Sequence, residues 1–177
     1  MKKTMIAGLL AVIVAFSGCA SVGKAPLING NTIEMGLVVD KGNPDSMKDK
    51  QWENRVQIAG YMERGIMDLL RGSGYEAKLY KNASEFQSAP GKYLLVVSIE
   101  KYNPGSKAAR MMVGFGAGAV SMDTKYDVYG PDASSVYNNT TGIASSKDWI
   151  YVVNKTNSVI VKAVNTRMNV LFPSAAK

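Results

Sequence analysis

The chain has 177 residues, with 21 lysines and arginines against 14 acidic residues, one cysteine and no histidine. Without histidine it lacks the commonest general base and metal ligand, a Ser–His triad is excluded, and one cysteine leaves no internal disulfide. The net charge of +7 favours anionic neighbours such as lipid head groups or the cell wall. The sequence contains no basic cluster interleaved with aromatic residues, the pattern that would indicate nucleic-acid binding.

The N-terminal end predicts a secretory signal. Lys2 and Lys3 precede twelve apolar residues at positions 5–16, and small residues follow at 17–21. A basic start, a short apolar core and small residues at a cleavage site define such signals. The apolar core is shorter than the roughly 18–20 residues that a membrane span needs, which favours cleavage over an uncleaved membrane helix.

Residues 16–19, Phe-Ser-Gly-Cys, resemble the lipobox of bacterial lipoproteins, although leucine is usual where Phe16 stands. The resemblance implies a signal peptide over 1–18, cleavage before Cys19 and lipidation of that cysteine. Ala20 resembles the outer-membrane sorting pattern, so we expect an outer-membrane anchor. Two or more acyl chains give stable attachment, at about 0.8 kcal/mol for each buried methylene. On this interpretation Cys19 is an anchor and no thiol remains for catalysis.

Small and turn-forming residues continue to position 31, so we predict a lipidated cysteine and tether over 19–31. Extended, this tether would reach roughly 40 Å. A single domain is expected over 32–173, with a frayed tail at 174–177.

The first strand is predicted at 32–40 and is followed by a helix from Asp45 or Ser46 to the glycines at 72–74. Gly60 and Gly65 lie inside this helix and are interpreted as points of close packing against a sheet. Apolar residues at steps of three and four predict the buried face, which consists of Trp52, Val56, Ala59, Met62, Ile66, Leu69 and Leu70.

Four further strands are predicted at 75–80, 92–102, 119–130 and 136–145, the last of them polar and edge-like. A second helix follows from Asp148 to about Leu171, with an apolar stripe of Ile150, Val153, Ile160, Val164 and Leu171. This order indicates an α+β domain, with an antiparallel or mixed sheet of four to five strands and two helices packed on one face.

The glycine-rich segment 112–120 carries Gly114, Gly116 and Gly118 but no lysine and hydroxyl directly after them, as a phosphate loop would require. It also leads into a strand rather than a helix, which argues against a dinucleotide fingerprint. Alternating glycines leave one face of a strand bare. We expect a packing or bending role, with an interaction surface as the alternative.

Pro104-Gly105, Arg110 and the run Gly114-Phe115-Gly116-Ala117-Gly118 resemble bacterial lipoproteins of domain-of-unknown-function family 4410. The resemblance implies a location and a fold rather than an activity. The expected interaction or structural motif comprises Arg110, Gly114, Phe115, Gly116 and Gly118. Arg110 is alternatively a solvated turn residue or half of an ion pair.

We therefore expect no catalytic, cofactor or metal site. The predicted function is that of a non-catalytic outer-membrane lipoprotein facing the periplasm, a binding or adaptor module for an envelope assembly or cell-wall process. Its partners would be the membrane, through Cys19, and an envelope protein. The alternatives are a purely structural lipoprotein, or a glycan-active enzyme with two acids near Glu100 or Asp123. The strand at 136–145 is a hypothetical edge for another strand.

Overall fold

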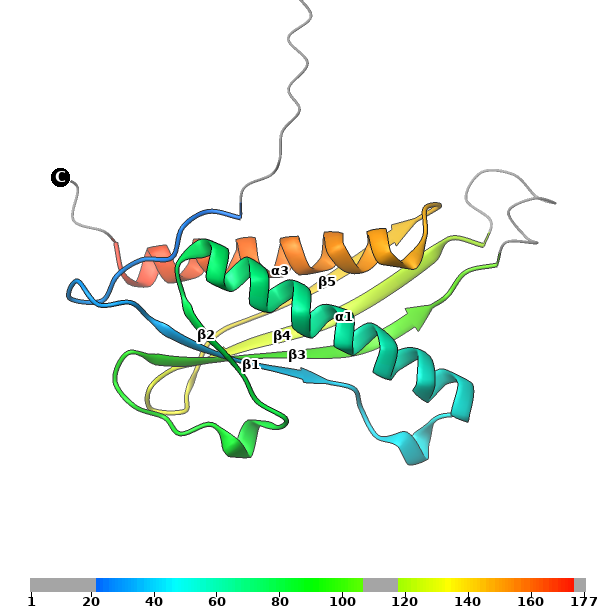
Figure 1. Cartoon of the computed structure of the whole chain (residues 1–177), viewed down its shortest axis with the longest axis horizontal. Helices are drawn as coiled ribbons and strands as arrows, with labels where there is room; N and C mark the ends of the chain where they lie inside the picture. Colours follow the sequence, from blue (N-terminus) through cyan, green and yellow to red (C-terminus); the bar gives the residue numbers. More distant parts are fainter. Residues whose placement is uncertain (1–21, 107–117, 174–177) are drawn as a thin grey trace, which may run out of the picture.

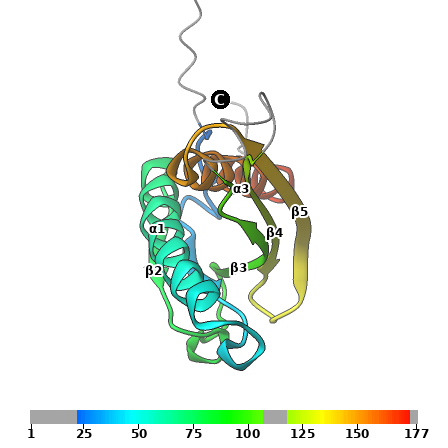
Figure 2. The ribbon, with the colours of Figure 1, turned by 90° about the vertical axis from the view of Figure 1, so that its right-hand side faces the viewer.

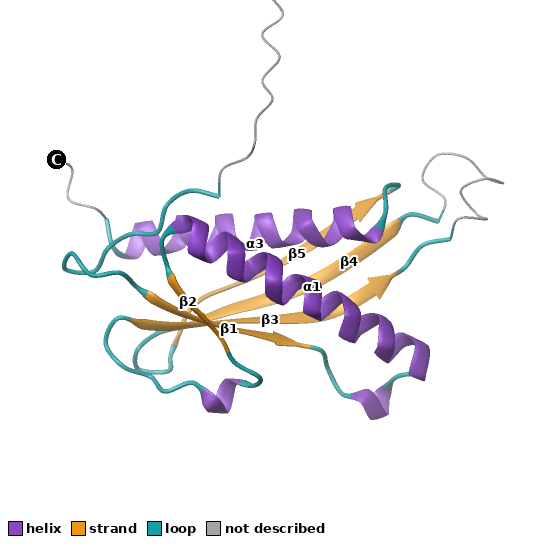
Figure 3. Ribbon diagram, viewed as in Figure 1, coloured by secondary structure: helices purple, strands orange, loops and turns teal. Residues whose placement is uncertain are grey.

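The computed structural model describes residues 22–106 and 118–173. These form one five-stranded sheet and two long helices (Figures 1 and 3). The elements are β1 (Glu34–Asp40), the 3-10 turn η1 (Pro44–Ser46), α1 (Asp49–Ser73), β2 (Glu76–Leu79), the 3-10 turn η2 (Ala83–Glu85), β3 (Lys92–Asn103), β4 (Val120–Tyr129), β5 (Ser135–Ser145) and α3 (Trp149–Leu171).

The strands follow the order β2-β1-β3-β4-β5 across the sheet. β1 runs parallel to both β2 and β3, whereas β3, β4 and β5 pair antiparallel. β3 occupies the centre, because Leu94 and Leu95 bury successive side chains on opposite faces. The predicted mixed α+β sheet is confirmed.

Both helices cover the same face of the sheet, α1 over β1, β2 and β3 and α3 over β4 and β5, as Figure 2 shows end-on. The core lies between these two layers. A fully buried large aliphatic side chain stabilises the fold by about 1.5–3 kcal/mol. Among the largest buried side chains are Met35, Leu37, Leu95, Met122 and Tyr126 from the sheet and Met62, Ile66, Leu70, Ile160 and Met168 from the helices.

α1 begins later than predicted. The expected start lies in η1, where the Asn43 side chain accepts from the Asp45 N–H at 3.0 Å, and Met47 is extended before the helix opens. Its end at Gly74, with φ of 104°, follows the predicted glycines. The prediction that Val56 is buried is wrong, since it is 41 % exposed. Arg55 instead takes a place on the sheet-facing side, and Ile58 and Met67 complete the buried face.

α3 starts as predicted, with the Asp148 side chain accepting from the Tyr151 N–H at 2.9 Å. The prediction for Ile150 is wrong, because 39 % of it is exposed. Trp149 packs inward instead, its ring edge-on to Tyr61 of α1 with 4.8 Å between centroids. The buried face also takes side chains that apolar periodicity did not include, among them Thr156, Asn157, Val161, Asn165 and Met168.

Residues 80–91 cover part of the opposite face of the sheet. β2 and β3 are both parallel to β1, so the chain must cross a face of the sheet to connect them. The rings of Tyr80 and Phe86 pack there against Leu94 and above Gly36, where an added Cβ would lie 2.9 Å from Tyr80 Cε2. A segment expected as a surface connection thus shields the central strands.

The N-terminal segment differs from the expected tether from Val22 onward. Val22, Ala25 and Ile28 pack against the core. Figure 1 shows this segment, in dark blue, on the helix side of the molecule. α3 contributes side-chain donors to backbone carbonyls of residues 22–24. Cys19 and the predicted signal lie outside the described residues.

Within residues 22–106 and 118–173, neither helix is long and apolar enough to cross a membrane.

Candidate functional site

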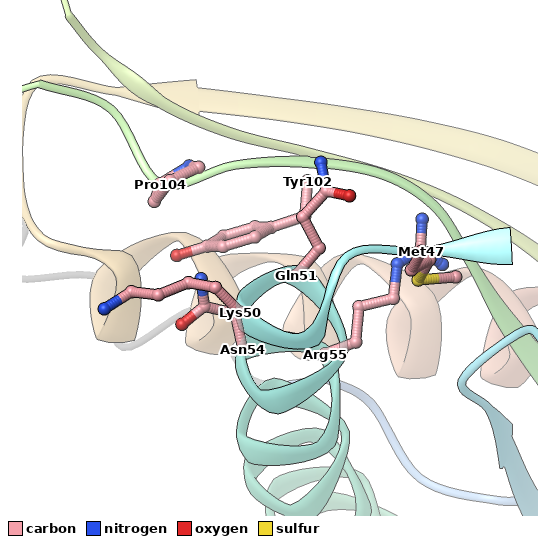
Figure 4. A pocket seen from close by; sticks show the side chains of 7 residues that line it. All are labelled: Met47, Lys50, Gln51, Asn54, Arg55, Tyr102 and Pro104. Carbon is pink, nitrogen blue, oxygen red and sulfur yellow. The ribbon is translucent and has the colours of Figure 1, made fainter. Parts of the chain in front are cut away.

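A groove of about 340 Å³ lies where the first turns of α1 pass the end of β3 (Figure 4). One wall comes from the helix and the other from the strand and the turn that follows it. Donor groups and one aromatic ring line it, and no carboxylate is among its lining residues. Those residues are Met47, Lys50, Gln51, Asn54, Arg55, Tyr102 and Pro104.

Arg55 holds the two walls together. Its guanidinium donates from Nη1 to the carbonyl of Ile99 and, at 3.5 Å, to that of Lys41, and from Nη2 to the carbonyl of Glu100 at 2.9 Å. The β3–β4 register shifts between Ile99 and Lys101, and such a bulge leaves backbone groups without ladder partners. Arg55 pairs with these carbonyls and is therefore a positioning residue for the groove.

Tyr102 contributes the aromatic wall. Burial raises the pKa of its phenol above the ordinary value, and a tyrosine hydroxyl is in any case neutral and able to donate at physiological pH. Figure 4 shows the amine of Lys50 and the amide of Asn54 near the hydroxyl end of the Tyr102 ring. A neutral phenol, a cation and an amide beside an aromatic face suit an acceptor-rich or anionic ligand.

The groove adjoins the turn where Pro104 and Gly105 leave β3. The Ser106 N–H donates to the carbonyl of Gly118 at 3.0 Å. Gly105 has φ of 72°, and a Cβ there would lie 2.5 Å from the Gly118 oxygen. The Gly105 N–H is held by the side chain of Asn103 at 2.9 Å. Glycine is thus required where the two chain segments meet beside the groove.

Of the predicted motif, the structure places Gly118, which meets Gly105 at this contact. Arg110, Gly114, Phe115 and Gly116 lie outside the described residues. Their expected interaction or packing role therefore stays a prediction.

Sequence reasoning missed Lys50, Asn54 and Tyr102 as a group, because they come from elements about 50 residues apart in the chain. The available signal was Arg55, a cation among the inward positions of an otherwise apolar helix face.

The acids named for the glycan-active alternative lie on neighbouring strands. Glu100 is exposed at the bulge, where its carbonyl accepts from Arg55. Asp123 faces Gly142 of β5, where an added Cβ would lie 2.8 Å from the Asp123 Oδ1. Among the residues that the structure describes, no group of three or more histidine, cysteine or acidic side chains could hold a metal ion.

A family model described as "Domain of unknown function (DUF4410)" matches residues 28–167. Among solved structures, a PelC dodecamer from Paraburkholderia phytofirmans is similar in fold, with a TM-score of 0.51 and 9 % identity, over 81 % of this chain and 93 % of PelC.

Two further structures are more distant. A second PelC dodecamer structure from the same organism has a TM-score of 0.45 at 10 % identity, covering 82 % of this chain and 92 % of that chain. An uncharacterized lipoprotein B from Nitrosomonas europaea has a TM-score of 0.36 at 11 % identity, covering 92 % of this chain and 99 % of that protein. No curated protein matches the chain.

Proposed function

Because the chain belongs to the family of the domain of unknown function DUF4410, we propose that it is a lipid-anchored, non-catalytic binding module of the outer membrane. It faces the periplasm and assists an envelope assembly or cell-wall process through an envelope partner. The observation that carries the binding role is the groove between α1 and β3. Arg55 joins its helix wall to the backbone of β3, and its lining includes no carboxylate.

The chemistry of the groove favours binding over catalysis. General acid–base work without histidine needs paired carboxylates or a perturbed lysine, and the groove presents lysine, amides and a neutral phenol. These groups hold a ligand by hydrogen bonds and by contact with the Tyr102 ring. The expected ligand is an acidic or carbonyl-rich surface of a protein partner.

The anchor rests on the sequence around Cys19, and the short chain between Cys19 and the domain is compatible with it. Labelling cells with a tagged fatty acid tests this part directly. We expect label on the wild-type chain and none on a Cys19→Ala variant. Equal labelling of the two would reject Cys19 as the anchor.

The groove is tested by in-cell photo-crosslinking of the full lipidated chain. A photoreactive amino acid replaces Asn54, inside the groove, or Glu53, which is exposed on the same helix and does not line it. We expect one envelope protein to crosslink at position 54 and not at 53. Equal capture at both positions would reject the groove as the binding site.

If position 54 captures nothing while Cys19 carries lipid, the adaptor role fails. The purified protein would then be assayed against cell-wall and other glycans, which tests the enzymatic alternative.

A further inference from the structure

The outward side of α3 carries positive charge without any acid. Between Trp149 and Leu171 the helix contains Lys155, Lys162 and Arg167, and neither aspartate nor glutamate. Lys155 and Lys162 are exposed and seven residues apart, which places them on one face. No acidic neighbour at i±3 or i±4 on this helix compensates them, so this face attracts anions.

Apolar side chains accompany these cations. A shallow groove of about 470 Å³ runs between α3 and β5, lined in part by Val159, Ala163 and Val170. Val170 is 65 % exposed, the largest exposure among the large hydrophobic residues that the structure describes. Lys162 and Arg167 flank the groove. Cations beside exposed aliphatic groups are typical of helices that lie in a membrane interface.

The chain leading from the proposed anchor joins the domain on this same helix. Asn165 Nδ2 donates to the carbonyl of Val22 at 2.7 Å, and Asn169 Nδ2 donates to that of Lys24 at 2.8 Å. Only residues 20 and 21 separate Cys19 from Val22. Three residue steps span about 10 Å when extended. A lipid on Cys19 would therefore hold the Asn165 end of α3 close to the membrane surface.

We propose that the outward face of α3 rests on the membrane, with Lys155 and Lys162 against the phosphates of anionic phospholipid head groups and Val170 toward the acyl boundary. This inference rests on the proposed lipid anchor and adds the face that the anchor presents. On the opposite side of the sheet, β4 carries the exposed Asp123 and Lys125, and Lys125 forms an ion pair at 3.3 Å with the less exposed Asp127. That mixed surface gives anionic lipid no comparable attraction.

The test uses the lone cysteine of the chain. Once Cys19 is lipidated, a new cysteine is the sole thiol and its reaction with a water-soluble maleimide reports exposure. The lipidated full chain is placed in vesicles of phosphatidylethanolamine and phosphatidylglycerol, carrying Thr166→Cys on the α3 face or Gln87→Cys in the connection on the other face. Both positions are exposed in the structure.

We expect Thr166→Cys to react roughly tenfold more slowly in these vesicles than in detergent, given the attraction of two lysines to anionic lipid, and Gln87→Cys to react equally in both. Lys155→Glu with Lys162→Glu should restore the reactivity at position 166. Lys81→Glu with Lys101→Glu, a control with the same change of charge at other exposed positions, should not.

Equal reactivity of the two cysteines in vesicles would overturn the proposed orientation. Protection in phosphatidylcholine vesicles that rises with protein density would identify a second copy as the occupant and also overturn it. Reaction of the wild-type chain itself would show that Cys19 is unlipidated, and the anchor would then fail together with the face. An unreactive wild type with an exposed position 166 would leave the anchor standing and reject the face alone.

Discussion

At Gly105 two parts of the chain come closer than a side chain permits. Gly105 and Gly91 both have positive φ, 72° and 79°, but only a Cβ at Gly105 meets backbone, whereas one at Gly91 meets nothing within 4 Å. We expect Gly91→Ala to lower the free energy of unfolding by about 1 kcal/mol, from the left-handed conformation alone. Gly105→Ala should cost about 2–3 kcal/mol. Urea denaturation measures both, and equal losses would show that the contact between Gly105 and Gly118 relaxes freely.

Arg55 stabilises the fold by donating hydrogen bonds to backbone carbonyls. Its removal leaves the carbonyls of Ile99 and Glu100 without this donor. We expect Arg55→Ala to lower the free energy of unfolding by about 2 kcal/mol, the typical contribution of hydrogen bonds from a charged group. Arg64→Ala on the same helix, which removes a guanidinium 4.7 Å from the centre of the Tyr61 ring, should cost about 0.5 kcal/mol. A smaller effect at position 55 than at 64 would contradict this account.

Tyr126 causes the free energy of unfolding to fall at alkaline pH. Burial, and then the neighbouring Tyr137, raise its pKa from 10.0 to about 12. Below pH 10 the Tyr126 phenol is neutral in both the folded and the unfolded protein, and its contribution to stability is fully present. Between pH 10 and 12 the unfolded state loses its proton first, so stability falls by about 1.4 kcal/mol per pH unit. Burial also raises the pKa of Tyr75, which adds to the loss.

This pH dependence is measured by urea denaturation at pH 7 to 11. We expect a flat profile to about pH 9.5 and then a decline, which is shallower in Tyr126→Phe. An unchanged slope in that variant would assign the decline to other groups.

At the scale of the elements, α1 and α3 meet where Gly65 faces Asn157. A Cβ at Gly65 would collide with Nδ2 of Asn157, a buried side chain whose amide atoms have no hydrogen-bond partner in the structure. Gly60 lies on the same helix, and a Cβ there would meet only Arg64 Nη1, at 3.7 Å. We expect Gly60→Ala to stabilise by about 0.5–1 kcal/mol, and Gly65→Ala to destabilise by about 2 kcal/mol.

A double-mutant cycle tests whether Gly65 and Asn157 interact directly. Gly65→Ala combined with Asn157→Ala should lose less stability than the sum of the two single changes, because the small side chain makes room for the new methyl group. Thermal or urea unfolding of the four proteins gives the coupling. Strict additivity would show that the helices separate rather than collide.

Much of the element order could be predicted from the sequence, because local periodicity sets it. The central strand, the alternating β4 and the Asp148 start of α3 follow from patterns within a few residues. The crossing at 80–91 could not be predicted, since it depends on parallel pairing of strands distant in sequence. The groove could not be predicted either, because it also depends on contacts between distant segments: Arg55 joins α1 to carbonyls 44 and 45 residues away.

At the scale of the whole molecule, Asn165 ties the first described residues to the last helix. Asn165 is 2 % exposed, and its amide also donates to Ser73 Oγ at 2.9 Å. We expect Asn165→Ala to release the backbone of this segment, so that trypsin cleaves after the exposed Lys24 several-fold faster. Asn154→Ala, an exposed asparagine on the same helix, is the control. Digestion followed by mass spectrometry measures the rate, and equal cleavage of both variants would show that the apolar contacts alone hold the segment.

The contact between Asn165 and Val22 spans 143 positions of the chain. This hydrogen bond therefore forms only after α3 has joined the rest of the domain, and the closure of so long a loop slows folding. Until α3 arrives, the N-terminal segment and the α1 face that α3 covers stay open to proteases and chaperones. The N-terminal segment is therefore fully protected only after the C-terminal helix has packed.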